Sequence, residues 1–111
     1  MNINRLIMDT LVPLNVPVSF LNYNLSDDTY IVFNEYNQMP WLNANDTEMW
    51  TKHFIQVDVF SKGNYINLVK EVKNAMKQAG FGRMFESETY DNDMNMYRKI
   101  LRFSYISKEE N

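Results

Sequence analysis

Hydrophobic positions recur at helical spacing in two parts of the chain. Apolar residues lie three and four apart from residue 3 to residue 14, and Asn2 can cap the helix that they predict. Because the residue before a proline avoids helical angles, Pro13 should end this helix near Leu11 or Val12. A second helix, with lysines on its polar side and Gly80 as its C-terminal stop, is predicted by the spacing of Ile66, Val69, Val72, Met76 and Ala79.

Alternating apolar and polar positions predict four strands. They cover Thr29 to Tyr36, Glu48 to Ser61, about Arg83 to Tyr90, and Met94 to Ser107. Residues 16–20 contain a proline, which suits an edge strand or an extended connector. Residues 37–46 are polar and predict a loop.

The last two strands should form a hairpin around a turn centred at Asn92. That turn would set Glu86 opposite Arg98 and Met84 opposite Ile100. Leu101, Phe103 and Tyr105 would then face the core.

The predicted order is helix, strand, strand, helix, strand, strand, which indicates an α+β fold. We expect a mostly antiparallel sheet of about four strands with both helices packed on one face. At 111 residues, one domain spanning 1–111 is the natural size.

Composition narrows the possible partners. The net charge is −3 and the pI is near 5.0, which argues against nucleic acid as a partner of the isolated domain. No apolar run is long enough to cross a membrane. The absence of cysteine excludes disulfides, thiolate metal sites and cysteine nucleophiles.

Candidate catalytic and metal-binding groups are few. His53 is the only histidine and has no carboxylate at a motif spacing, so an ordinary strand residue is the simplest interpretation. Asp58 should form an ion pair across the sheet, and turn chemistry explains Asp91 and Asp93. We therefore expect no enzyme activity, no cofactor and no metal site.

A surplus of large apolar residues surrounds the predicted loop. Such side chains could fold back over the edge of the sheet, or they could form a contact with another protein, where tryptophan and methionine are enriched. The candidate residues for a subunit or partner interface are Met39, Trp41, Leu42, Met49 and Trp50.

Three segments carry a family resemblance: "TYIVFNEYNQ" at 29–38, "HFIQVDVFSKGNYINLVKEVKNAMKQAGF" at 53–81, and "ESETYDNDMNMYRKILRFSY" at 86–105. Their order and spacing resemble the tail-completion and head–tail joining proteins of long-tailed bacteriophages, which include the tail terminators. The shared features are a strand of the type at Tyr30 to Phe33, a "VDVFS" strand before a helix that ends in Gly80-Phe81, and an acidic turn before a strand with Leu101, Phe103 and Tyr105.

The resemblance implies a structural virion protein of a phage or prophage, without enzyme activity. Such a protein would be assembled in the host cytoplasm and located in the tail or at the head–tail interface. It would associate with itself, possibly as a hexameric ring, and with tail-tube and head-connector proteins. A ring contact of this kind requires two different complementary patches on each subunit.

A second hypothesis belongs to a different class: a ferredoxin-like module that binds nucleic acid or a regulatory ligand. It predicts a basic patch around Arg83, Arg98, Lys99 and Arg102 and salt-sensitive binding to single-stranded nucleic acid.

Overall fold

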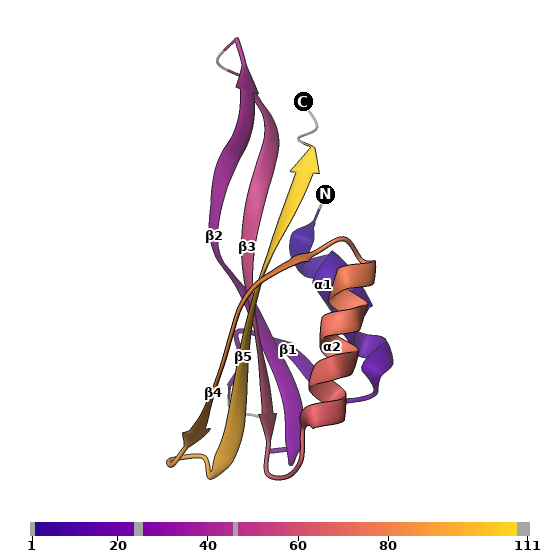
Figure 1. Ribbon diagram of the computed structural model, residues 1–111, viewed down its shortest axis with the longest axis vertical. Helices are drawn as coiled ribbons and strands as arrows, with labels where there is room; N and C mark the ends of the chain where they lie inside the picture. Colours follow the sequence, from indigo (N-terminus) through magenta and orange to yellow (C-terminus); the bar gives the residue numbers. More distant parts are fainter. Residues whose placement is uncertain (1, 24–25, 46, 109–111) are drawn as a thin grey trace.

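The structure, a computed structural model, describes residues 2–23, 26–45 and 47–108 of the chain, with the side chains of 43, 44, 47 and 48 left out. Two helices, α1 and α2, and a short 3-10 turn, η1, accompany five strands (Figure 1). Their bounds are α1 Ile3–Leu11, η1 Val12–Leu14, β1 Val18–Phe20, β2 Thr29–Ala44, β3 Thr47–Ser61, α2 Ile66–Gln78, β4 Gly82–Asp91 and β5 Met96–Lys108.

The five strands form one mixed, mostly antiparallel sheet in the order β1-β2-β3-β5-β4. The predicted α+β class is confirmed, but the expected four strands and the order α-β-β-α-β-β are wrong; the order is α-β-β-β-α-β-β. The additional strand is β1, which pairs with β2 in parallel and occupies the sheet edge. Pro17 lies just before it and contributes only its carbonyl oxygen, which accepts a 2.8 Å hydrogen bond from the Ile31 N–H.

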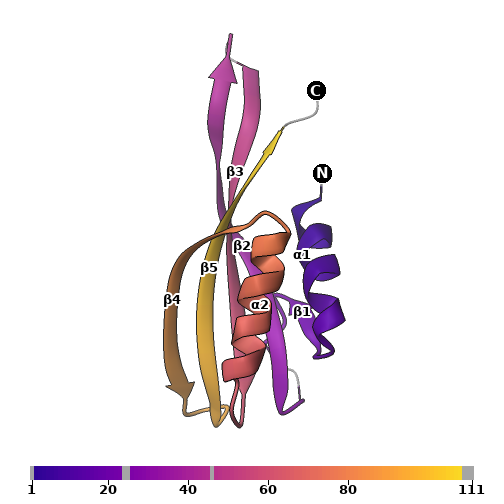
Figure 2. The same ribbon diagram turned by 45° about the vertical axis from the view of Figure 1, so that its right-hand side comes forward.

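Both helices pack on the same face of the sheet, as predicted (Figures 1 and 2). The helix α1 begins where expected, because the Asn2 side chain accepts a 3.1 Å hydrogen bond from the Arg5 N–H, and it ends at Leu11. The residues buried between helices and sheet are Ile3, Ile7, Leu11, Ile31, Phe33, Ile55, Val57, Val59, Val69, Val72, Met76, Phe81, Leu101 and Phe103.

The opposite face is buried only near the start of β2. There Tyr30 stacks on Phe60 with ring centroids 5.0 Å apart, and Val32 and Met96 complete a small second cluster. Tyr23, from the segment before β2, packs against this cluster. The rest of this face is free of helices.

The strands β2 and β3 continue as a hairpin well past both helices, which gives the molecule extents of 51 × 25 × 21 Å (Figure 1). The predicted loop over residues 37–46 is therefore wrong, because β2 runs to Ala44; Asp46 lies outside the described residues. Pairing with β3 persists through register shifts after Glu35 and around Leu42. Since β1 covers only residues 31–33, this part of β2 is an edge, where Pro40 is tolerated.

The hairpin of β4 and β5 is confirmed, but its predicted register is wrong. Asp91 pairs with Met96, and Glu86 lies opposite Leu101 rather than Arg98. The turn is longer than expected because the Asp91 side chain caps it and Asn95 adopts a left-handed conformation with φ 54°. No helix in the described part of the chain is long and apolar enough to span a bilayer.

Candidate assembly interface

The hairpin beyond the helices, residues 37–44 of β2 and 47–54 of β3, is called the arm below. The end of β5 lies beside it, since Ile106 pairs with Lys52 and Lys108 with Trp50. The outer part of the arm extends past both helices in the views of Figures 1 and 2. The root of the arm, at Thr51 and His53, is buried.

A hollow of about 330 Å3 lies on the helix-free face of the arm, lined by Trp41, Leu42, Trp50 and Ile106. Leu42 pairs with Trp50, so the two side chains share that face. Trp41 is the extra residue at a register shift, and the Lys52 ammonium lies 4.6 Å from the centroid of its ring. A cation over an indole face is attractive and holds the ring in place.

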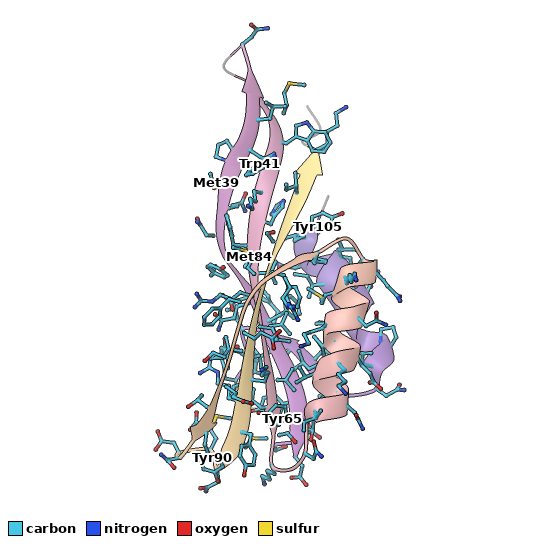
Figure 3. The ribbon with its side chains drawn as sticks, in the orientation of Figure 1. Met39, Trp41, Tyr65, Met84, Tyr90 and Tyr105 are labelled. Carbon is cyan, nitrogen blue, oxygen red and sulfur yellow. The ribbon has the colours of Figure 1, made fainter. Side chains whose placement is uncertain are left out.

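Trp41 and Leu42 remain about half exposed, at 51% and 52%, so neither side chain folds back to bury itself on the sheet. An apolar patch of this kind on a folded protein is typical of a contact surface. The sequence placed the residues in a loop, whereas the structure places them in paired strands that fix their directions (Figure 3).

The two methionines of the predicted interface lie differently. Met39 pairs with Lys52 and is exposed on the same face as the hollow. Met49 is also exposed, but it is the extra residue of β3 at the register shift between Leu42 and Asn43, and it does not line the hollow. The structure thus brings Trp41, Leu42 and Trp50 together and leaves Met49 apart.

Ile106 was missed as a member of the patch. Its signal is in the sequence, because Ser104 and Ile106 alternate with the core residues Phe103 and Tyr105. Recognising it required the pairing of β5 with the arm, which sequence alone did not give.

Aromatic and cationic side chains extend the patch toward the body of the sheet. The ring of Tyr36 lies 6.1 Å from that of Phe54, and the Arg102 guanidinium lies between Tyr36 and Phe85, 5.0 and 5.2 Å from their centroids. Arg102 also donates a 3.1 Å hydrogen bond to Gln56. The surface available to a partner is therefore larger than the hollow.

A buried polar network fixes the root of the arm. His53 Nδ1 lies 2.6 Å from Glu35 Oε2, and its Nε2 lies 2.9 Å from Ser107 Oγ. The sequence did not reveal a carboxylate partner for His53, because Glu35 lies in the neighbouring strand β2, 18 positions earlier in the chain. Serine hydrolases use the same order of groups. Here, however, His53 and Ser107 are only 8% and 6% exposed, and the network ties β2, β3 and β5 together.

The remaining candidates behave as structural groups. Asp58 is buried and accepts a 2.7 Å hydrogen bond from Arg98, the ion pair expected for it. Asp91 accepts from the backbone N–H groups of Asp93 and Met94, which is the predicted turn chemistry. Among the described residues, no three acidic or histidine side chains gather in a way that could hold a metal ion.

The four basic residues of the nucleic-acid hypothesis do not form one patch. Arg83 and Lys99 are ion-paired with Glu86, at 2.9 and 3.2 Å. Lys99 alternates with Arg98 and Arg102 along β5, so it lies on the opposite face of the sheet from them. Arg98 is in turn neutralised by Asp58.

No protein-family model matches the chain, and no curated protein is significantly similar to it.

Proposed function

We propose that this protein is a structural assembly protein of a phage or prophage virion. It completes the tail, joins the tail to the head connector, or does both, and it works as a ring of identical subunits. Its function is then to bind other proteins, with no chemical reaction.

The observation that carries this proposal is the arm. A paired hairpin that extends beyond the helices and displays Trp41, Leu42 and Trp50 is suited to reach a neighbouring subunit. Tryptophan is among the side chains that contribute most to binding in protein interfaces. The resemblance to tail-completion proteins supplies the kind of assembly.

The residues that carry the resemblance lie mainly in the body of the sheet and at the end of α2. Tyr30 to Phe33 and Val57 to Ser61 pair with each other in β2 and β3, and Leu101 and Phe103 lie beside them in β5. Gly80 has φ 100° and ends α2. The matched residues thus support the centre of the fold, whereas the arm carries the exposed surface.

The first experiment is light scattering after size exclusion, over a concentration series, with wild type and Trp41→Glu. We expect wild type to form a ring-sized species and Trp41→Glu to lose it, because a charge in an apolar interface has to be desolvated. Ile66→Glu is the matched control. Ile66 is equally exposed, but it lies at the start of α2, where an acidic residue is favourable.

If Trp41→Glu assembles like wild type, the arm is not the interface. A wild-type protein that stays monomeric and also binds neither tail-tube nor head-connector proteins would contradict the proposed function itself.

A further inference from the structure

A second hollow, of about 560 Å3, lies between α2 and the start of β4. It is lined by Lys73, Asn74, Lys77, Phe81, Gly82, Arg83 and Phe103. Phe81 and Phe103 are core residues and form its floor, whereas the cationic side chains come from α2 and β4. Its volume is typical of a binding pocket.

Positive charge is in excess at this pocket. Lys73, Arg83 and Lys99 all pair with the single carboxylate of Glu86, at 3.2, 2.9 and 3.2 Å. Burial would raise the pKa of Glu86, but hydrogen bonds from the Lys73 and Lys99 ammonium groups outweigh burial and lower it. Lys77 has no ion pair with any described residue, so its positive charge is available to an anionic group in the pocket.

The turn between β4 and β5, residues 91–95, is acidic and already ordered. The Asp91 carboxylate is used within the turn, where it accepts from the backbone of Asp93 and Met94. The Asp93 side chain is exposed and forms no ion pair with a described residue. Such a preformed turn can dock with little loss of conformational freedom.

The pocket and the turn lie at opposite ends of β4. The ten residues of β4 run from Gly82 to Asp91, which is about 30 Å of extended strand. Figure 3 shows this separation, with Met84 near the start of β4 and Tyr90 at its lower end. A subunit therefore cannot place its turn in its own pocket.

We propose that the acidic turn of one copy docks into the 73–83 pocket of a second copy, with Asp93 facing Lys77 and Arg83. This inference rests on the proposed function, because it requires self-association. Two different patches that complement each other give a heterologous contact, which propagates into a ring when its rotation closes. The charges of pocket and turn are opposite, and such complementarity fixes the register of an interface.

Disulfide trapping tests the contact directly, because the chain has no cysteine of its own. Lys77→Cys and Asp93→Cys chains are mixed under mild oxidation and resolved without reductant. We expect the mixed dimer in at least tenfold excess over either homodimer. In the control, Asn67→Cys replaces Lys77→Cys. Asn67 is exposed on the same helix, about 15 Å from residue 77, so a cysteine there is too far from the docked residue 93 to form a disulfide.

Charge reversal provides the second readout. We expect Lys77→Glu and Asp93→Lys each to weaken self-association about tenfold, and the double variant to recover most of the loss. Equal yields of all cross-linked dimers, or single variants that associate like wild type, would overturn the contact. If Trp41→Glu still weakens association in that case, the proposed function stands without it. The contact is also overturned if wild type forms no oligomer and the Lys77→Cys and Asp93→Cys chains form no cross-link. In that case, a separate test of binding to tail-tube or connector proteins decides the proposed function.

Discussion

The body of the sheet and the arm are built from the same two strands, yet they differ in what covers them. In the body, Ile31 and Phe33 of β2 and Val57 of β3 are buried under both helices. A few residues further along the same strands, Trp41 and Leu42 are half exposed. The backbone pairing is continuous, so the difference lies in the layers above the sheet and not in the strands.

This contrast separates residues used for folding from residues available for binding. Burial of a large side chain stabilises the fold by about 1.5–3 kcal/mol relative to its exposure. Trp41 and Leu42 obtain only part of that gain within one chain. A partner that covers them would supply the remainder.

Truncation of one aromatic residue in each region should give the largest difference. Phe33→Ala removes a ring that is 1% exposed, and we expect it to lower the free energy of unfolding by about 3–5 kcal/mol. Trp41→Ala should cost less than about 1 kcal/mol, because its ring contacts mainly other arm residues. Urea unfolding of the two variants measures both values. Equal losses would mean that the arm belongs to the folding core.

A smaller effect is expected at the boundary between the two regions. Ser107→Ala removes the partner of His53 Nε2 and leaves a buried polar atom unsatisfied, which costs about 1–3 kcal/mol. We also expect faster hydrogen exchange in residues 49–53 than in residues 57–60, because the root of the arm loosens first. Ser87→Ala, at an exposed position of β4, is the control. Identical stability of the two variants would show that the network does not hold the arm.

Much of the body could be predicted from sequence because its signals are local. Helix periodicity, Asn2 as a cap and Gly80 as a stop each depend on neighbours within one or two turns. The arm could not be predicted in this way. Asn37, Pro40 and Asn43 are typical of loops, and they become strand residues only because β3 pairs with them. One signal was present: a predicted strand from Glu48 to Ser61 needs a partner longer than Thr29 to Tyr36.

Other features depend on contacts between distant residues. The predicted hairpin register was wrong because Asp91 and Asn95 lengthen the turn, which shifts every pair that follows. The network at His53 joins residues 18 and 54 positions away, so no spacing rule could reveal it. Residue type alone indicates the candidate interface residues, and only the structure shows which of them share a face.

The smallest expected effect is a change of stability at high pH. It concerns Tyr65, which lies at the end of the body opposite the arm and has a hydrogen-bond partner there. A hydrogen bond from Tyr65 to Glu88, together with burial and the charge of Glu88, raises the pKa of Tyr65 from 10.0 to about 12. The stability from this bond should be fully present below pH 10 and be lost as the pH rises through about 12, because the phenolate repels the carboxylate. Tyr65→Phe should therefore be less stable than wild type at pH 8, and the difference should shrink toward pH 12. Tyrosine absorbance near 295 nm should lose its latest step in this variant. An unchanged late step would mean that another tyrosine has the most strongly raised pKa. The hydrogen bond from Tyr65 to Glu88 would then not stabilise this end of the body.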